Sequence, residues 1–558
     1  MKRLLGACAL LCLWCHAAFA AVTGSQLTAQ LLTGLDLPLS KPLTSDADAL
    51  AEGARLGIFS DADNWVDGPL TKGLGLNLAF RSLGLDIELD IADLLLENPN
   101  RFSQRRLESV SLLASTIKPE VPSSLLEDTD ALMTEADLSA LLGWVARAKA
   151  GLVWDQKIET DAGILWLHRQ GLGRPPKSWR VSLASFASPA EAESAKSRYA
   201  SAPFEVQLFQ LEEYTHLASP ALASAAEAKK LSAKFDGSIV IEGDSAPSEA
   251  LFFVAWSPNE SHEGWLLSAR QVGKKSLPLS KYWGYSNAVV ALNGGYFGGG
   301  KPIGTLIMNG LPQYLPYTGR TLVGWKGTHT AFGLPDFRIV MTDSSTRAVA
   351  RDINNPPPPG EASFYAPPLG AAPNLSDALV QSYTSDVSGR SVKWWAATKG
   401  PALPEPADAN FELQWGAQEL EGINWGLQGG PLLLKDGMVQ TKNEGVARGV
   451  THNRHPRTLV GVKEGRQWWI VVDGRNSWHS RGMTLAEATS WAQQNGFSDL
   501  LNLDGGGSSE FIYQGRIINN PSDGRERALP YAVMFGGELR DENSPLSDPL
   551  QSLFDSLP

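Results

Sequence analysis

One acidic, glycine-rich segment near the end of the chain has the residue types for chemistry. Its sequence is Asn502-Leu503-Asp504-Gly505-Gly506-Gly507-Ser508-Ser509, and apolar residues flank it on both sides. Glycines let the end of a strand turn sharply and direct backbone N–H groups into a concave nest that suits phosphate oxygens. The Asp504 carboxylate and the Ser508 hydroxyl would line the same hollow. Asp-Gly-Gly is also an ordinary turn sequence, so the segment indicates either an anion-binding loop or a plain turn.

Two further segments have the same form, in which a Gly-Gly pair precedes a short apolar strand and a turn. Asn293-Gly294-Gly295 leads to Asn309-Gly310, and Gly429-Gly430-Pro431 leads to Asp436-Gly437, as the Asp504 segment leads to Gln514-Gly515. Each closing dipeptide is typical of a hairpin turn. The sequence does not decide between internal repetition and recurrent turn chemistry, but three such loops could converge on one site.

The elements that position these loops are strands, with one clear helix. Asp473 follows the apolar run 469–472, which predicts a strand end. Thr484-Leu485-Ala486-Glu487 predicts a capping box at the start of a helix, so we assign Glu487 to the helix and not to a site. We therefore predict a multidomain protein in which α-helical N-terminal repeats precede an α+β catalytic domain with a mixed β-sheet and Gly-rich loops.

Several separated motifs between 248 and 539 occur in one order that resembles the phosphodiester glycosidase family. They are Asn293-Gly294-Gly295-Tyr296-Phe297, Gly429-Gly430-Pro431, His455-Pro456-Arg457-Thr458, Asp473-Gly474-Arg475, Gly482-Met483-Thr484-Leu485, 502–509, Asn520-Pro521-Ser522-Asp523 and Arg525-Glu526-Arg527. The resemblance implies a hydrolase that removes a sugar from a phosphodiester. Such an enzyme must hold an anion while positive charge develops at the anomeric carbon.

The resemblance and this chemistry together give candidate site residues. Asp504 is the first candidate for the catalytic carboxylate, followed by Asp473 and Glu526, and His455 could donate a proton or a hydrogen bond to the leaving phosphate. Arginines suit bidentate phosphate contacts. The candidate substrate-binding residues are Asn293, Arg457, Arg475, Gly505, Gly506, Gly507, Ser508 and Arg527.

Each candidate has a structural alternative. An arginine can form a salt bridge, Asp473-Gly474 can be turn chemistry, and His455 beside Pro456 can be a loop residue bonded to backbone. Phosphate is a good leaving group, so an acid catalyst could be dispensable. A carboxyl separation of about 5 Å would indicate retention and one of roughly 6.5–9.5 Å inversion, but the sequence does not supply that distance.

The first twenty residues have the three parts of a secretory signal peptide. Lys2 and Arg3 precede the apolar run 4–13, and Ala18-Phe19-Ala20 predicts cleavage before Ala21. All three cysteines lie in this segment, so a mature chain would have neither disulfides nor thiolate metal sites. We therefore predict export to the periplasm, the cell envelope or the extracellular space. We also predict that the chain has no transmembrane span.

Residues 47–149 have helical apolar spacing and appear as one unit written twice, in which Thr71 and Thr134 each cap a second helix. The pattern resembles the S-layer homology repeat, which implies binding to a cell-wall polymer. Residues 160–245 predict a β-α-β accessory region that resembles the first half of a sporulation-related repeat, with a strand at 179–186, a helix at 189–199 and a strand at 204–208. Residues 540–558 are assigned to a C-terminal tail.

The net charge and its distribution limit the classes of molecule that the chain can bind. The formal net charge is −12 and no basic stripe is present, which argues against nucleic acid. No cofactor is required by the predicted chemistry, but Asp and Asn residues leave open a divalent cation such as calcium. We therefore predict an exported glycosidase for sugar-1-phosphodiester linkages in envelope or extracellular glycans. The alternatives are a cation-dependent phosphodiesterase and a non-catalytic cell-wall-binding protein.

Overall fold

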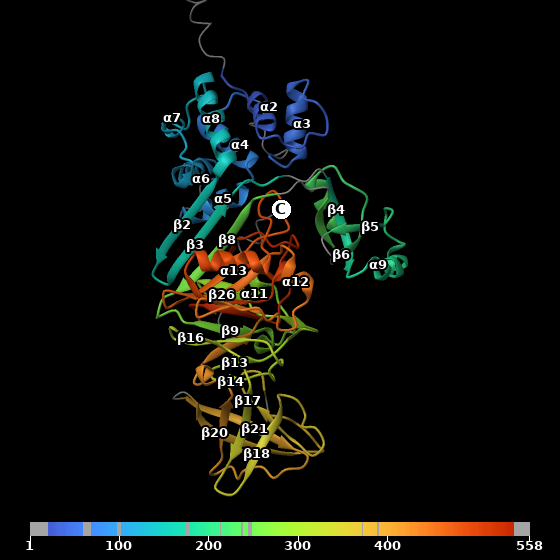
Figure 1. Cartoon of the computed structure of the whole chain (residues 1–558), viewed down its shortest axis with the longest axis vertical. Helices are drawn as coiled ribbons and strands as arrows, with labels where there is room; N and C mark the ends of the chain where they lie inside the picture. The colour runs from blue at the N-terminus through green and yellow to red at the C-terminus, as the bar shows by residue number, and fades with distance from the viewer. Residues whose placement is uncertain are drawn as a thin grey trace, which may run out of the picture. The chain divides into compact units, whose positions relative to one another are not determined.

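The computed structural model describes residues 21–59, 68–96, 102–174, 178–211, 214–235, 238–243, 248–370, 372–387 and 390–540 (Figure 1). The predicted signal peptide and, except for Arg540, the predicted tail lie outside the described residues. The chain divides into two compact units. The first unit contains Met1–Ser257, Gly430–Ser509 and Ile518–Arg525, and the second contains Pro258–Gly429, Glu510–Ile517 and Glu526–Pro558. The predicted glycosidase range, 248–539, is therefore shared between the two units.

A nine-stranded sheet is the centre of the first unit. Apolar runs rich in β-branched and aromatic residues form its inner strands. Its strand order is β1 (Ile117–Lys118), β2 (Val153–Thr160), β3 (Gly163–Gln170), β8 (Leu251–Pro258), β27 (Arg466–Val472), β26 (Arg457–Lys463), β28 (Phe497–Asn502), β24 (Leu432–Lys435) and β25 (Met438–Val439).

Helix α13 (Leu485–Gln494) packs against this sheet (Figure 1). Its buried residues Leu485, Ala488 and Ala492 join a core cluster with strand residues such as Phe253 and Ile470. The capping box at its start is confirmed, because the Thr484 side chain accepts from the Glu487 N–H and the Glu487 side chain accepts from the Thr484 N–H.

The N-terminal part of the first unit contains seven described helices. The predicted caps are confirmed: Thr71 accepts from the Leu74 N–H at the start of α4, and Thr134 forms a capping box at the start of α8. The helices are α2 (Gly24–Gly34), α3 (Asp46–Arg55), α4 (Lys72–Ser82), α5 (Asp86–Leu95), α6 (Phe102–Thr116), α7 (Ser123–Leu126) and α8 (Glu135–Gly151).

The predicted fold class, helical N-terminal repeats followed by an α+β domain, was wrong. Most of the regular structure is β-sheet, and the helices of 47–149 are part of the first unit and not a separate repeat array. Helix α6 runs directly into β1, which pairs with β2 at the edge of the nine-stranded sheet. Apolar spacing of three and four predicted the helices correctly, but such spacing does not reveal what they pack against. Binding of a cell-wall polymer, inferred from that repeat, loses its structural basis.

The accessory region forms a complete β-α-β-β-α-β unit with sheet order β5-β6-β4-β7. The predicted strand and helix are confirmed as β4 and as α9 with its 3-10 extension, whereas β5 begins three residues later than expected. The second half, which the sequence pattern did not reveal, is β6, α10 and β7. The bounds are β4 (Ser178–Phe186), α9 (Pro189–Ala195), β5 (Gln207–Leu211), β6 (Tyr214–Ala218), α10 (Ala225–Ser232) and β7 (Ile239–Gly243).

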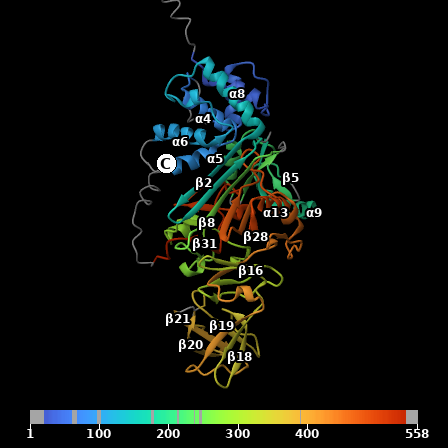
Figure 2. The same cartoon turned by 60° about the vertical axis from the view of Figure 1, so that its left-hand side comes forward.

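The second unit contains three larger sheets and helix α11 (Leu279–Gly284). The six-stranded sheet (Figure 2) contributes Trp394 and Phe364 to a core that also contains buried residues from outside this sheet, such as Ile307 and Leu322. Its order is β20 (Leu379–Val387), β21 (Arg390–Thr398), β19 (Ala362–Tyr365), β18 (Arg347–Ile353), β17 (Phe337–Thr342) and β22 (Asn410–Trp415). A five-stranded sheet has the order β30 (Arg516–Ile517), β29 (Phe511–Tyr513), β10 (Val290–Asn293), β31 (Tyr531–Phe535) and β9 (Gly264–Ser268).

The remaining five-stranded sheet of the second unit repeats a part of the nine-stranded sheet. Its order, β14-β13-β23-β15-β16, matches β25-β24-β28-β26-β27 strand for strand, and the chain visits the matched strands in the same sequence. The six-stranded sheet is inserted before β23, where the other copy has α13. The strands are β13 (Leu306–Met308), β14 (Leu311–Pro312), β15 (Leu322–Lys326), β16 (His329–Gly333) and β23 (Trp425–Gln428).

Backbone hydrogen bonds confirm that this is repetition and not recurrent turn chemistry. Leu322 pairs with Gln428 as Leu459 pairs with Asn502. Gly429 N–H donates to Thr321 O at 2.9 Å, and in the other copy Leu503 N–H donates to Thr458 O at 2.8 Å. The sequence left open whether the glycine segments are internal repeats. These hydrogen bonds answer that question for the segments at Gly429 and at Asp504.

The loop 474–481, which follows β27, is held by close backbone contacts within the first unit. Ser477 N–H donates to both carboxylate oxygens of Glu242 at 2.8 Å, and Arg174 N–H donates to Ser477 O at 2.8 Å. A Cβ at Gly173 would lie 1.7 Å from Trp478 O. Only glycine therefore fits where this loop meets the residues after β3.

The described helices include none with the length and hydropathy to cross a bilayer.

We predict that Gly173→Ala destabilises the first unit, because the added methyl group must displace the backbone of the 474–481 loop. Overpacking of this kind typically lowers the free energy of unfolding by about 1–3 kcal/mol. Chemical denaturation followed by tryptophan fluorescence measures the effect. Gly151→Ala is the matched control, since a Cβ there meets nothing within 4 Å. Equal stability of the two variants would contradict the close contact.

Candidate active site

Antiparallel pairing gathers the sequence candidates of the first unit at one edge of the nine-stranded sheet. Arg457 at the start of β26 pairs with Val472 at the end of β27, and Leu459 pairs with Asn502 at the end of β28. Because neighbouring strands run in opposite directions, the start of β26 and the ends of β27 and β28 share this edge. The segments that carry His455, Asp473, Arg475 and Asp504 therefore meet there.

Arg475 is an exposed cation at this edge. Its backbone has φ 58°, in the left-handed region that few residues other than glycine adopt, which is typical of functional loops. Its Nη2 lies 3.1 Å from His455 Nδ1. A Cβ at Gly506 would lie 3.2 Å from Arg475 Nη1, so the glycine loop, residues 504–508, packs beside the guanidinium.

His455 is a neutral hydrogen-bonding partner and holds no extra proton near neutral pH. Its Nε2 lies 3.2 Å from Gly449 O, which can only accept, so Nε2 carries the hydrogen and Nδ1 accepts from Arg475. Burial and the charges of Arg475 and Arg457 lower the pKa of His455 to about 3. The ring can therefore orient Arg475. The geometry does not favour the predicted proton donation to a leaving phosphate.

The glycine loop forms a short 3-10 turn, η5 (Gly506–Ser508), and not an open nest. Gly506 N–H donates to Pro456 O at 2.9 Å, and Ser508 N–H donates to Gly505 O at 3.2 Å. Two of the N–H groups expected to cradle phosphate are therefore bonded to backbone carbonyl groups. The half-buried Asp504 begins the loop, while Ser508 is fully buried.

Asp523 is a second carboxylate at this loop. A Cβ at Gly507 would lie 2.1 Å from Asp523 Oδ2, so this carboxylate lies directly over the glycine. Asp523 lies in the motif 520–523, and the sequence pattern assigned it no role. Its contact with Gly507 is the signal that could have selected it, and only the fold reveals that contact.

Arg457 is held by the backbone. Its side chain is buried, with 1% of the residue exposed. Nε donates to Met483 O at 2.8 Å, and Nη2 donates to Asn453 O at 2.7 Å. These bonds connect the start of β26 to the segments that precede β26 and α13, which favours a positioning role over the predicted phosphate contact.

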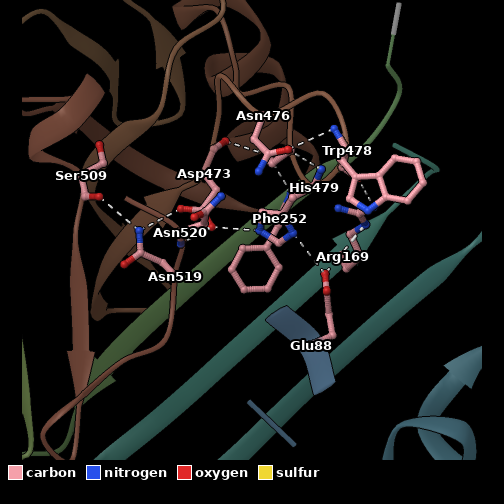
Figure 3. Close-up of polar contacts among 11 residues, drawn as sticks. Glu88, Arg169, Phe252, Asp473, Asn476, Trp478, His479, Ser509, Asn519 and Asn520 are labelled. Carbon is pink, nitrogen blue, oxygen red and sulfur yellow. Dashed lines mark hydrogen bonds and ion pairs between the residues drawn. The ribbon is translucent and has the colours of Figure 1, made fainter. Parts of the chain in front are cut away.

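Asp473 is the acceptor of a buried polar network (Figure 3). Oδ1 accepts from Asn519 Nδ2 at 2.8 Å, and Oδ2 accepts from the Asn520 N–H at 2.8 Å. His479 Nε2 lies 3.0 Å from Oδ2. Asn519 Nδ2 also donates to Ser509 O at 3.1 Å. Asp473 therefore joins three loops at the sheet edge, and this arrangement favours a positioning role for the second-choice catalytic candidate.

The network continues to charged groups that sequence reasoning missed. Glu88 of α5 and Arg169 of β3 are both fully buried, and Glu88 Oε1 lies 3.7 Å from His479 Nδ1 and 3.9 Å from Arg169 Nε (Figure 3). Within the described chain neither Glu88 oxygen accepts a hydrogen bond. Burial lowers the pKa of Arg169, and the charges of Glu88 and Asp473 oppose that effect. We call these residues, with Asp473, His479, Asn519 and Asn520, the Asp473 network.

Three predicted site residues belong to the second unit. Asn293 ends β10, and its Oδ1 accepts from the Glu510 N–H at 3.3 Å. Glu526 accepts from the N–H and the hydroxyl of Ser280 at 2.7 and 2.6 Å, so it caps the start of α11. Arg527 is half-buried. Their roles stay predictions, as do those of the first-unit candidates. Among the described residues, no group of three or more His, Cys, Asp or Glu side chains is arranged to hold a metal ion.

A sequence model of the phosphodiester glycosidase family matches residues 385–536. Three curated relatives match shorter segments. SPbeta prophage-derived uncharacterized protein YomE of Bacillus subtilis (strain 168) is 43% identical over 77 residues, which are 14% of this chain and 12% of that protein. N-acetylglucosamine-1-phosphodiester alpha-N-acetylglucosaminidase is 29% identical over 111 residues in Mus musculus and 28% in Bos taurus, over 19% of this chain and 21% of each relative. The chain thus spans about a fifth or less of these relatives.

Solved structures cover more of the chain, with TM-scores below 0.5. A Burkholderia pseudomallei K96243 protein described as exported gives 0.45 at 17% identity, over 69% of this chain and 96% of that one. A hypothetical protein from Synechocystis gives 0.41 at 16% identity, over 68% and 79%. The zebrafish N-acetylglucosamine-1-phosphodiester alpha-N-acetylglucosaminidase catalytic domain, auto-inhibited by its pro-peptide, gives 0.27 at 14%, over 70% and 83%. The likeness to the phosphodiester glycosidase family is therefore a likeness of 385–536, the range that holds the glycine loop, Arg475 and Asp523.

The Asp473 network makes a stability prediction. Glu88→Gln removes the carboxylate nearest Arg169 and leaves a buried cation without its partner, which typically lowers the free energy of unfolding by about 3–5 kcal/mol. Because Met has similar volume and no charge, the double variant Glu88→Gln/Arg169→Met should recover most of that loss. Urea denaturation measures both variants. Additive losses in the double variant would contradict the pairing.

The neutral state of His455 makes a prediction about pH. Its pKa is about 3 in the folded chain and near the ordinary histidine value of 6.5 when unfolded, so below pH 6.5 the unfolded state binds the proton first. The stabilisation is complete above pH 6.5 and is lost as the pH falls toward 3. His455→Gln should therefore flatten the fall in unfolding free energy over this range. Burial and the charge of Arg475 lower the pKa of His216 to about 4, so His216 acts in the same direction. The exposed His329 provides the control, and an identical pH slope for His455→Gln and His329→Gln would refute the account.

Proposed function

We propose that this chain hydrolyses the glycosidic bond of a sugar-1-phosphodiester. The observation that carries the proposal is the grouping of Arg475, two carboxylates and the glycine loop at one sheet edge, inside the range that matches the phosphodiester glycosidase family. The mouse and bovine relatives are named for hydrolysis of an N-acetylglucosamine-1-phosphodiester, which supports the same substrate class.

The positively and negatively charged residues of the site have different roles. Arg475 binds the phosphodiester anion, and neutral His455 accepts one of its N–H groups, which fixes the guanidinium while its other donors bind phosphate oxygens. Asp504 and Asp523 stabilise the positive charge that develops at the anomeric carbon, and one of them activates water or attacks that carbon. The leaving group is a phosphate monoester. Asp473 and the buried residues behind it hold the three loops in place.

The proposed location and natural substrate rest on the sequence of the N-terminal segment. Residues 1–20 have the pattern of a signal peptide, which supports export to the envelope or the extracellular space. Envelope and extracellular glycans contain sugar phosphodiesters and are the substrates we propose.

The proposed activity predicts that the full chain releases free sugar from a synthetic N-acetylglucosamine-1-phosphodiester. A positioned acid, base or nucleophile contributes roughly 10²–10⁴ to the rate, so Asp504→Asn or Asp523→Asn should lose activity by that factor. Liberated sugar is measured by mass spectrometry in water labelled with oxygen-18, and cleavage of the C–O bond places the label on the sugar.

The exposed Asp408 gives the matched control, Asp408→Asn, which should keep full activity. Label on the phosphate would instead indicate a phosphodiesterase acting on the P–O bond. Full activity in both Asp504→Asn and Asp523→Asn would remove the assignment of the carboxylates.

A further inference from the structure

The two copies of the repeated sheet have an arginine at the same position. The segments Arg320-Thr321-Leu322-Val323-Gly324 and Arg457-Thr458-Leu459-Val460-Gly461 are identical in sequence. The pairing of Leu322 with Gln428 and of Leu459 with Asn502 places the two segments in the same register of their sheets. Arg320 is thus the counterpart of Arg457 in the second unit.

The environments of the two arginines differ. Arg457 donates to two backbone carbonyl groups and is buried. The Arg320 guanidinium instead contacts two tyrosine rings, with its Cζ 4.7 Å from the centroid of Tyr296 and 4.7 Å from that of Tyr317. No described residue accepts a hydrogen bond from Arg320 Nε or Nη1, although both atoms are shielded from solvent. Shielded donors without acceptors are unfavourable, and an anion would satisfy them.

The position of Arg320 is fixed from the backbone side. Gln428 Nε2 donates to Arg320 O at 2.8 Å and to Tyr317 O at 3.0 Å, and Gln428 Oε1 accepts from the Tyr317 N–H at 2.7 Å. A cation–π contact uses the face of a guanidinium, so the in-plane N–H groups take no part in it. The arrangement is therefore rigid and directional, as binding of a planar or tetrahedral anion requires.

The surroundings suit a carbohydrate that carries an anionic group. Tyr296 directly follows the Asn293-Gly294-Gly295 loop, where a Cβ at Gly295 would lie 2.1 Å from Gln428 O, so this loop packs against the residue that holds Arg320. Tyr317 is 48% exposed. Aromatic rings beside a cation offer a sugar an apolar surface and its phosphate a charge partner.

We propose that Arg320, in contact with the rings of Tyr296 and Tyr317, is a binding residue for the phosphate group of a sugar phosphate. The phosphate accepts hydrogen bonds from the Arg320 guanidinium. Identification of this ligand as the substrate rests on the proposed function, whereas binding itself requires no hydrolysis.

The test is isothermal titration of the full chain with N-acetylglucosamine 1-phosphate and, separately, with inorganic phosphate. Arg320→Gln should weaken binding of the sugar phosphate at least tenfold, and Arg320→Lys should weaken it less because charge remains without the fork of donors. Thermal unfolding confirms that both variants are folded. Arg347→Gln, an exposed arginine of the same unit, is the control and should bind as the unmodified chain does.

Unchanged affinity in both Arg320→Gln and Arg320→Lys would overturn the proposal, as would failure of the unmodified chain to bind the sugar phosphate. If inorganic phosphate binds in an Arg320-dependent way and the sugar phosphate binds no more tightly, the contact between Arg320 and the anion is supported. The tyrosine rings then contribute nothing to the affinity for the sugar. Arg320-dependent binding by a chain that hydrolyses no phosphodiester would support this inference and defeat the proposed function. Hydrolysis of the phosphodiester, together with unchanged affinity for the sugar phosphate in both Arg320 variants, would do the reverse.

Discussion

The antiparallel pairing of β26 with β27 and β28 is the constraint on which the candidate site depends. This pairing brings segments near residues 455, 473 and 504 to one edge of a sheet, although they are far apart along the chain. The glycine loop, Arg475 and Asp523 acquire their neighbours only because these strands end together. A slip of one residue in this register would turn each side chain to the opposite face and separate the group.

The loops beyond the strand ends are held by buried polar groups and not by apolar packing alone. Asp473 bonds to Asn519, to the backbone of Asn520 and to His479, and the last contact extends to Glu88 on α5. Such a network is favourable only when its charges remain paired. The N-terminal helices therefore contribute to the geometry around the candidate site, which a detachable anchor would not do.

Sequence reasoning succeeded where a local pattern determines a local structure. The Thr484 and Glu487 capping box, the caps at Thr71 and Thr134 and the strand before Asp473 all follow from neighbours within a few residues. It failed where packing decides. Periodicity predicted the helices of 47–149 but could not show that α6 continues into β1 of the central sheet. The fold class was wrong for this reason.

The same division holds within the site. Motif order identified Arg475 and the glycine loop, whose types suit phosphate and sugar chemistry. It could not separate Arg457, which donates to backbone carbonyl groups, from Arg320, which contacts two tyrosine rings, because both precede the same four residues. Glu88 had no sequence signal, since an acidic residue in an amphipathic helix is ordinarily exposed.

The most direct test of the central claim is a crystal structure of the chain with N-acetylglucosamine 1-phosphate bound. The account predicts the anomeric carbon facing the carboxylate of Asp504 or Asp523, with a phosphate oxygen within hydrogen-bond distance of the Arg475 guanidinium. A sugar phosphate bound with its anomeric carbon away from both carboxylates, and with no contact to Arg475, would contradict it.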